Sequence, residues 1–187
     1  MRKTKEAFGF ETQRLRLRSW RNGDNRRFNQ ACNTAAVMRW LGGLQTQRQL
    51  NRDVTYFARH EAQHGYTFWV VEHLVEDRVL GICGLVQIVE RDCPFRGATE
   101  IGWRIRQDDW RHGYAFEAAR AVLDISFGEL ALSSVVSRAA SENTASRRLM
   151  KKLGMTHKRA LDYQARDGTK LCVYAISAEQ WLDRKAR

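Results

Sequence analysis

The sequence has few of the residues that form disulfides, metal sites or membrane spans. Its four cysteines, Cys32, Cys83, Cys93 and Cys172, lie far apart, without the close pairs of zinc or redox motifs, so we expect buried thiols. The five histidines show no metal-ligand spacing, and we predict no metal site. No apolar run approaches the ~20 residues that span a bilayer, and the charged N-terminus has no apolar segment behind it. We therefore expect a soluble, cytoplasmic protein without a membrane partner.

Positive charge is the unusual feature of the composition. The chain has 32 Lys and Arg against 21 Asp and Glu, a formal net charge of +11. Such a chain attracts anions in general, so nucleic acid, a ribosome surface, an acidic protein and a phosphorylated cofactor are all open as partners. Hydrophobic residues at 43% and charged residues at 28% are near globular averages. Since the sequence shows no repeat or linker, residues 1–187 are predicted to form a single domain.

The hydrophobic pattern predicts an α+β fold. Strands are expected at residues 14–20, 66–75, 78–89, 98–106, 134–139, 155–163 and 170–177, and helices at residues 24–40, 46–63, 114–130, 144–153 and from 177 onward. Short turns make hairpins of the second and third strands and of the last two. The helix pattern at residues 114–130, by contrast, lies between two strands as a crossover. We therefore predict a mostly antiparallel sheet with one strand-helix-strand crossover in its middle.

Local signals mark some ends of these elements. Asp24 and Asn143 are predicted N-caps, and Ser177 with Gln180 has the pattern of a capping box. Arginine alternates with leucine in residues 14–18, which predicts the solvated face of an edge strand.

The turn at residues 109–118 has the features of an anion site. Gly113 allows a tight turn, Arg111 and His112 supply positive charge, and the following helix offers unpaired N–H groups at its start. The P-loop pattern is absent, which argues against ATP chemistry of that type. A dinucleotide fold is a weaker alternative, because Ala115 replaces the second glycine of its motif and the preceding strands are joined by a hairpin.

This turn resembles the acetyl-CoA pyrophosphate loop of the GCN5-related N-acetyltransferase (GNAT) superfamily, whose usual form is [RQ]-x-x-G-x-[GA]. In the RimJ/RimL-like branch, which acetylates the N-termini of ribosomal proteins, it commonly reads W-G-x-G-Y-A-T-E-A. The residues that match this branch are Trp110, Gly113, Tyr114, Ala115, Glu117 and Ala118. Two positions depart from it: Arg111 stands at the usual small residue and Phe116 at the usual threonine.

Three further segments are similar to the same branch, in the same order along the chain. Residues 11–18 resemble its T-x-R-L-x-L-R strand, residues 100–103 its E-I-G-Y strand, and residues 143–155 its N-x-x-S…LGF helix. The resemblance covers most of the chain. It implies the GNAT fold, in which a twisted central sheet is splayed between its two middle strands and has helices on both faces.

The resemblance also implies which residues bind acetyl-CoA (coenzyme A). The pantetheine arm is expected against the exposed backbone of the strand at 98–106, and the pyrophosphate at the helix start. The cofactor-binding residues expected on this basis are Trp103, Ile105, Arg111, His112, Gly113, Tyr114, Ala115, Asn143 and Ser146.

Glu100 is the candidate general base, since a carboxylate on the central strand could take a proton from the amine through water. The alternative is an ion pair with an arginine such as Arg138.

The candidate for the group that protonates the leaving thiolate is Ser146. Many family members place a tyrosine on this helix where the chain has Met150. Ser146 and Asn143 are the remaining polar groups there, and Asn143 is also expected to be a helix cap. Tyr163 on the last hairpin is a further option.

The function implied is acetyl transfer to a primary amine, directly within a ternary complex. The amine is either the N-terminus of a protein, such as a ribosomal one, or a small molecule. The region 24–63 is expected to determine the acceptor, with Trp40 as a pocket wall. A non-catalytic, basic acyl-CoA- or RNA-binding module is the alternative, although nucleic acid is disfavoured because the aromatics lie in strand patterns. Either a monomer or a homodimer fits the sequence.

Overall fold

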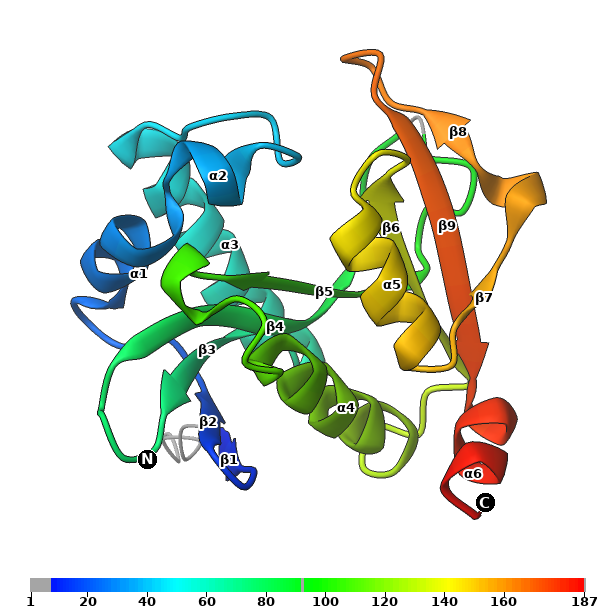
Figure 1. Ribbon diagram of the computed structural model, residues 1–187, viewed down its shortest axis with the longest axis horizontal. Helices are drawn as coiled ribbons and strands as arrows, with labels where there is room; N and C mark the ends of the chain where they lie inside the picture. The colour runs from blue at the N-terminus through cyan, green and yellow to red at the C-terminus, as the bar shows by residue number, and fades with distance from the viewer. Residues whose placement is uncertain (1–7, 92, 187) are drawn as a thin grey trace.

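The computed structural model describes residues 8–91 and 93–186 and contains a mixed sheet with helices on both faces (Figure 1). The strands are β1 (Gly9–Glu11), β2 (Leu15–Arg18), β3 (Phe68–His73), β4 (Val79–Gln87), β5 (Thr99–Ile105), β6 (Ser134–Ala140), β7 (Thr156–His157), β8 (Tyr163–Gln164) and β9 (Lys170–Ser177). The helices are α1 (Asp24–Cys32), α2 (Ala35–Met38), α3 (Gln47–His64), α4 (Tyr114–Phe127), α5 (Thr144–Lys152) and α6 (Ala178–Ala186), with 3-10 turns η1 (Gln107–Asp109) and η2 (Arg159–Leu161).

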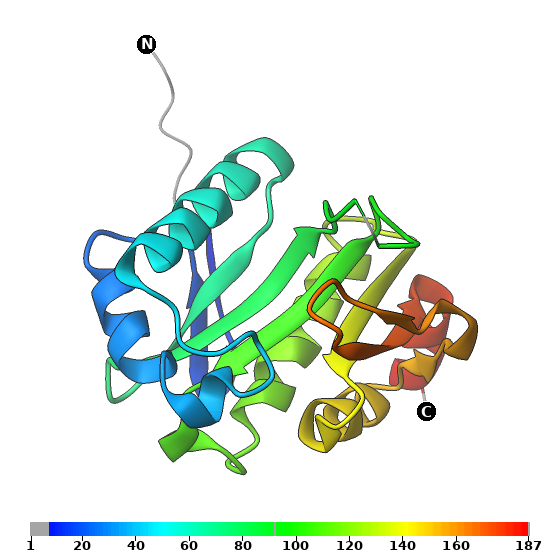
Figure 2. The ribbon, with the colours of Figure 1, turned by 90° about the horizontal axis from the view of Figure 1, so that it is seen from above.

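The sheet consists of two antiparallel parts that meet at one parallel pair of strands. Its order is β1-β2-β3-β4-β5-β6-β9-β7, and β8 also pairs with β9. Among the strands of the described residues, only the β5–β6 pair is parallel, and α4 makes the crossover between these strands. They share one bridge, Glu100 with Val136, whereas β5 is paired with β4 along its whole length. Beyond this bridge β5 and β6 diverge (Figures 1 and 2), and the predicted fold class, including the splay, is confirmed.

The two faces of the sheet are covered by different helices. The main core lies under α4, where Leu85 and Ile101 are fully buried together with Val122 of that helix. A second apolar cluster joins Phe28 of α1 to Ile82 of β4, so α1 packs on the opposite face (Figure 2). As a result, the two faces of β5 meet different environments.

The N-terminal strand differs from the prediction in two ways. It is not an edge strand, because β1 pairs with it, and Arg18 is not solvated but 2% exposed. The Arg18 guanidinium binds the carboxylates of Asp24 and Glu72. Glu72 is far from Arg18 in the sequence, so the alternation of arginine and leucine in residues 14–18 could not predict this ion pair. Asp24 is therefore an ion-pair partner rather than the N-cap, a position that Gly23 takes.

Other predicted ends agree with the structure more closely. Asn143 caps α5 by accepting the Ser146 amide hydrogen at 3.1 Å, and Ser177 and Gln180 form the predicted capping box at 3.0 and 3.2 Å. The helix expected at residues 24–40 is instead broken into α1 and α2, because Thr34 caps a new helix. The strand expected at 155–163 is likewise broken into β7, η2 and β8.

The four cysteines are free and buried, as predicted. Burial raises the pKa of Cys32 to about 12 and also raises that of Cys83. Within residues 8–91 and 93–186, no helix is both long and apolar enough to cross a bilayer.

The buried cluster around Arg18 gives a stability prediction. Arg18→Met should lower the free energy of unfolding by about 3–5 kcal/mol, because it leaves the two buried carboxylates with only the half-exposed Arg27, 3.3 Å from Glu72, as a cation. Urea unfolding measures this change. Arg16→Met is the control, since Arg16 pairs with Glu11 in a half-exposed position and should cost under about 1 kcal/mol. Equal effects of the two substitutions would contradict the prediction.

Candidate active site

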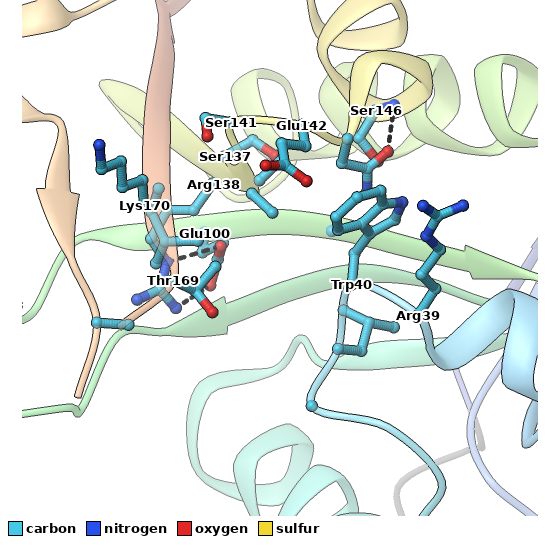
Figure 3. A pocket seen from close by; sticks show the side chains of 18 of the residues that line it. Arg39, Trp40, Glu100, Ser137, Arg138, Ser141, Glu142, Ser146, Thr169 and Lys170 are labelled. Atoms are coloured by element: carbon cyan, nitrogen blue, oxygen red, sulfur yellow. Dashed lines mark hydrogen bonds and ion pairs between the residues drawn. The ribbon is translucent and has the colours of Figure 1, made fainter. Parts of the chain in front are cut away.

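A cavity of about 960 Å³ opens where β5 and β6 diverge (Figure 3). One wall is the loop after α2, residues 39–43, and the opposite wall is the turn between β8 and β9, residues 165–171. Strand β6 and the start of α5 close the third side, from Ser137 to Ser146. In Figure 3 the Trp40 indole projects from its loop toward Ser146, so the predicted acceptor-pocket residue does line the cavity.

Both edges of the gap carry backbone hydrogen-bonding groups. Arg106 donates its amide to the Leu80 carbonyl of β4 at 2.7 Å. Because pairs alternate along an antiparallel ladder, the backbone groups of Trp103 and the Ile105 amide point to the other side, toward β6. The Ile105 carbonyl on that side is already taken by the Trp110 indole at 2.8 Å. The β5 edge can therefore pair with an extended ligand, mainly at Trp103.

The same reasoning applies to β6. Ser141 donates to the Lys170 carbonyl of β9 at 2.8 Å, so the backbone groups of Arg138 and the Ala140 amide point toward β5, while the Ala140 carbonyl already accepts the Asn143 amide hydrogen at 2.8 Å. An extended chain between the strands would find partners on both sides.

The predicted anion turn follows the open end of β5. Arg111 and Gly113 have φ angles of +67° and +85°, and α4 begins at Tyr114. In the described part of the chain, no acceptor takes the amide hydrogens of residues 111–116. Successive free amides at a helix N-terminus form an anion site. These residues do not line the cavity, which ends short of the turn.

Ion pairs from Arg78, the residue before β4, and from Arg106 hold this turn. Asp109 is 5% exposed and binds both terminal nitrogens of Arg78, one of them at 2.8 Å, while Arg106 Nε lies at 3.3 Å. Burial alone would raise the pKa of Asp109, but the hydrogen bonds from Arg78 keep it below its usual range. Asp109 was not identified as a supporting residue from the sequence, because Arg78 is 31 positions away.

A second anchor joins the first turn of α4 to the start of β2. Glu117 accepts hydrogen bonds from the Thr12 hydroxyl at 2.6 Å, the Arg14 amide at 2.8 Å and Arg14 Nε at 2.7 Å. Arg14 also donates to the His112 carbonyl at 3.1 Å and lies 4.5 Å from the centre of the Tyr114 ring. The two matching motifs at residues 11–18 and 109–118 are therefore in direct contact.

Glu100 lies at the vertex of the splay and is ion-paired. Arg138 Nε and Nη2 donate to its two carboxylate oxygens at 2.9 and 2.6 Å, and both side chains are about one-seventh exposed (14% and 13%). Arg138 also donates to the Tyr163 hydroxyl at 2.7 Å and to Glu90 at 3.1 Å. Burial alone would lower the pKa of Arg138, but these partners raise it. The ion pair expected as an alternative is present, and the role of Glu100 as a base stays a prediction.

The polar groups on α5 lie on the cavity wall beside Met150. Asn143 has its side-chain oxygen engaged in the cap, and Ser146 lines the cavity at the helix start. Tyr163 faces the same cavity from β8, and burial raises its pKa to about 12, so its phenol stays protonated at neutral pH.

The structure places the predicted site residues in two groups. Glu100, Trp103, Asn143 and Ser146 meet in the cavity, whereas the Ile105 side chain is 6% exposed in the main core. The residues of the turn, Arg111, His112, Gly113, Tyr114 and Ala115, lie together at the start of α4, apart from the cavity, and their binding of an anion stays a prediction.

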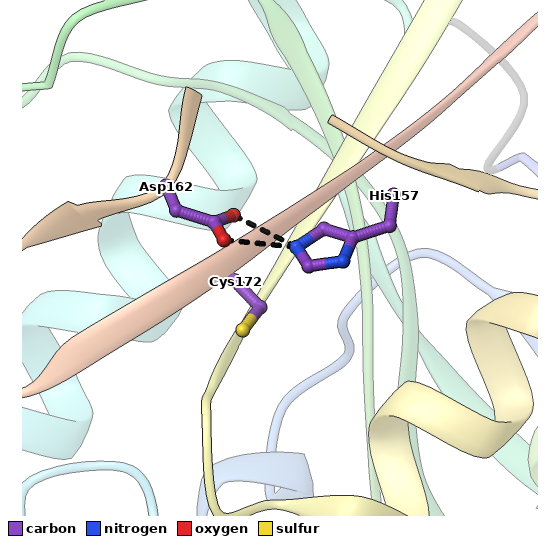
Figure 4. Close-up of side chains that lie close together, drawn as sticks. All are labelled: His157, Asp162 and Cys172. Atoms are coloured by element: carbon purple, nitrogen blue, oxygen red, sulfur yellow. Dashed lines mark hydrogen bonds and ion pairs between the residues drawn. The ribbon is translucent and has the colours of Figure 1, made fainter. Parts of the chain in front are cut away.

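A second cluster of polar side chains lies at the C-terminal strands (Figure 4). His157 Nε2 is 2.9 and 3.0 Å from the two carboxylate oxygens of Asp162, and Asp162 also accepts the Val173 amide at 2.8 Å. With Cys172, these side chains offer three ligand atoms within 4.8 Å of one another. Strand pairing creates this arrangement, so sequence spacing did not indicate it. The expectation that the chain binds no metal stays a prediction, which zinc titration can test.

Comparisons with known proteins point to one family. A family model described as Acetyltransferase (GNAT) domain matches residues 14–156. The uncharacterized protein YkkB of Bacillus subtilis is 33% identical over 151 residues, or 80% of this chain and 86% of that protein. A GNAT-family acetyltransferase structure from Bacillus anthracis has a TM-score of 0.76 at 23% identity, covering 92% and 99% of the two chains. The ribosomal-protein-S5-alanine acetyltransferase from Vibrio fischeri has a TM-score of 0.73 at 13% identity, covering 93% and 98%. These structural likenesses concern the fold.

The Glu117 anchor gives a pH-dependent prediction. Burial alone would raise the pKa of Glu117, but the hydrogen bonds from Thr12 and Arg14 hold it below its usual value of about 4.3. Its stabilisation is therefore present above that pH and is lost as pH falls through the folded pKa. Glu117→Gln should cost about 1–3 kcal/mol at pH 7, and the difference from the wild type should shrink below about pH 4.

Thermal unfolding across pH measures this difference. Glu129→Gln, an exposed carboxylate after α4, is the control and should have little effect at any pH. A deficit of Glu117→Gln that persists unchanged at pH 3 would contradict the prediction.

Proposed function

The chain belongs to the GNAT acetyltransferase domain family, and from that premise we propose that it transfers the acetyl group of acetyl-CoA to a primary amine. The observation that carries this proposal is the cavity at the β5–β6 splay together with the free amides of the turn before α4. A donor with an anionic end and a long amide-containing arm fits both features. Acetyl-CoA would supply an already activated acyl group.

The residues of the chain fit this donor. The amides of residues 111–116 and the positive end of α4 would hold the pyrophosphate, with His112 nearby as an additional donor. The backbone of Trp103 on one side, and of Arg138 with the Ala140 amide on the other, would pair with the amides of the arm. Asn143 and Ser146 would contact the donor from the start of α5.

Arg111 stands at a position of this loop where a small residue is usual. Its φ of +67° is a conformation that costs a residue with a side chain about 1–2 kcal/mol, which is a physical reason for glycine there. The Arg111 side chain is exposed. We infer that it extends away from the amides and adds positive charge near the phosphates without filling their site.

The proton transfers are assigned to groups at the cavity. Glu100 would accept the proton of the amine through a water molecule, with Arg138 as the positioning residue that fixes its carboxylate. Ser146 would hydrogen-bond the departing sulfur, and Tyr163, protonated at neutral pH, is the second candidate for this role.

The transfer would be direct, without an acetylated cysteine. The cysteines are buried, and the raised pKa values of Cys32 and Cys83 disfavour the thiolate form that a nucleophile needs. An acetyl adduct on a cysteine that forms and discharges at the catalytic rate would contradict this mechanism.

For the acceptor, we favour the N-terminal amine of a protein, as in the RimJ/RimL-like branch. The motifs that resemble this branch support the choice, as does the likeness of fold to the enzyme that acetylates ribosomal protein S5. A small-molecule amine is the second candidate. A non-catalytic module that binds RNA would instead show tight, steeply salt-dependent RNA binding and no acetyl transfer to any amine.

The anion turn gives a binding prediction. Gly113→Val should weaken coenzyme A binding by about tenfold or more, because a β-branched residue resists a φ of +85° and the turn must shift its amides. Calorimetry measures the affinity. Gly23→Val is a matched control, since Gly23 also precedes a helix with a φ of +90°, and it should leave coenzyme A binding unchanged. A folded Gly113→Val protein with wild-type affinity would refute the site.

The proposed base gives a kinetic prediction. Glu100→Gln should lower kcat/KM by about a hundredfold near neutral pH, and by less in alkali, where the amine is already deprotonated. Glu90→Gln is the control, because Glu90 also binds Arg138 but is half-exposed, and it should change the rate little. A loss in Glu100→Gln that is the same at every pH would indicate that Glu100 only supports the structure.

A further inference from the structure

Arg104 is a cation that lines the cavity and has no carboxylate partner among residues 8–91 and 93–186. It lies on β5, four residues after Glu100, and its guanidinium is 5.4 Å from the centre of the Phe28 ring. Its Nη1 makes one long hydrogen bond, 3.4 Å, to the Gln45 side chain, and its buried Nε has no hydrogen-bond partner in the described residues. Burial lowers the pKa of Arg104, so its positive charge is poorly solvated in the structure.

The nearest acid does not compensate this charge directly. Asp53 accepts a hydrogen bond of 2.7 Å from the Gln45 amide, so the Gln45 side chain stands between Asp53 and Arg104. Two other buried arginines do have carboxylate partners: Arg18 binds two carboxylates, and so does Arg138. Since a desolvated charge is costly unless paired, Arg104 is the cavity residue best prepared to receive an anion.

Arg104 and Glu100 lie on the same face of β5. Side chains two and four apart on a strand share a face, and four residues span about 13 Å at roughly 3.3 Å per residue. Between them, Gly102 carries no side chain and the Phe68 ring packs against it, so the floor there is apolar. This face is opposite to the face under α4, because Arg104 contacts Phe28 of α1.

Charged side chains of both signs line the rest of the cavity. Arg39, on the loop after α2, stacks on Trp40 at 4.7 Å and is a second cation on the cavity wall. Glu142, which follows β6, lies beside the Trp40 indole in Figure 3, and Asp167 lines the cavity from the β8–β9 turn. At the vertex, Arg138 neutralises both Glu90 and Glu100.

We propose that the acceptor carries an anionic group, a carboxylate or a phosphate, which binds Arg104 while its amine lies near Glu100. This inference rests on the proposed function, since Glu100 marks where the amine reacts. With an extended residue spanning about 3.3 Å, a peptide would place this group on its second or third residue from the amine. The proposal thus names a substrate class, amines with a nearby acid, within the larger class of primary amines.

Matched peptides test the proposal. Ala-Ala-Glu amide carries the acid in its third side chain, Ala-Ala-Gln amide is its neutral equivalent, and Ala-Ala-phosphoserine amide replaces the carboxylate by a phosphate. The wild type should prefer the acidic peptides over the neutral one by about tenfold or more in kcat/KM, mainly through KM. The ratio between glutamate and phosphoserine peptides identifies which anion the site favours.

Substitutions at Arg104 assign the preference to this side chain. Arg104→Met keeps an apolar stem of similar length and should abolish the preference for acidic peptides, leaving the rate with the neutral peptide and KM for acetyl-CoA nearly unchanged. Arg104→Lys should retain part of the preference. Arg59→Met removes an exposed charge on α3 and is the control for net charge, so it should keep the full preference.

A binding measurement separates this role from a structural one. Calorimetry with the N-acetylated glutamate peptide and coenzyme A should show weaker peptide binding to Arg104→Met than to the wild type, while the thermal midpoint is not lowered. Replacing a poorly paired buried charge by an apolar side chain is expected to be neutral or stabilising. If Arg104→Met does not fold, the wild-type preference and Arg104→Lys still decide the question.

The outcomes distinguish the two proposals. Equal kcat/KM for acidic and neutral peptides in the wild type would overturn the role of Arg104 and leave amine acetylation intact. A rise in KM for acetyl-CoA in Arg104→Met, without loss of acceptor preference, would assign Arg104 to the donor and overturn the proposal. Absence of transfer to any amine, with coenzyme A still bound, would refute the proposed function itself.

Discussion

The ion pair between Glu100 and Arg138 is the interaction on which the site depends. It joins β5 to β6 beside their one bridge, so it holds the two antiparallel parts of the sheet together at the point where the strands begin to diverge. The open edges past this point can bind a ligand because they are not paired with each other. Arg138 also reaches Tyr163 and Glu90, which ties the C-terminal hairpin to the same vertex. One guanidinium thus positions three groups around the proposed reaction centre.

The anion turn is held in place before any ligand arrives. Asp109 ties it to β4 through Arg78, and Glu117 ties the start of α4 to β2 through Arg14. The left-handed backbone at Arg111 and Gly113 directs successive amides outward without a partner. Because these donors are fixed in advance, binding an anion there requires little reorganisation of the chain.

The net charge of +11 has a different meaning once the positions of the arginines are known. Arg18, Arg78 and Arg138 are engaged with carboxylates inside the fold and do not contribute an open basic surface. Arg104 differs, because it is desolvated within the cavity and lacks such a partner. The location of a charge, more than the sum of charges, therefore indicates which anions the protein can bind.

The sequence by itself determined the features that depend on neighbouring residues. The turn around Gly113, the cap at Asn143 and the capping box at Ser177 rest on interactions within a few positions, and these agree with the structure, whereas the elements expected at 24–40 and 155–163 are broken and β1 was not predicted. The tertiary structure decided which distant groups meet. It buried Arg18 against Glu72, paired Glu100 with Arg138 and left Arg104 without a bound carboxylate in the described part of the chain. The reason is physical: a charged side chain takes its role from partners that folding brings close, and residue alternation along one strand carries no information about them.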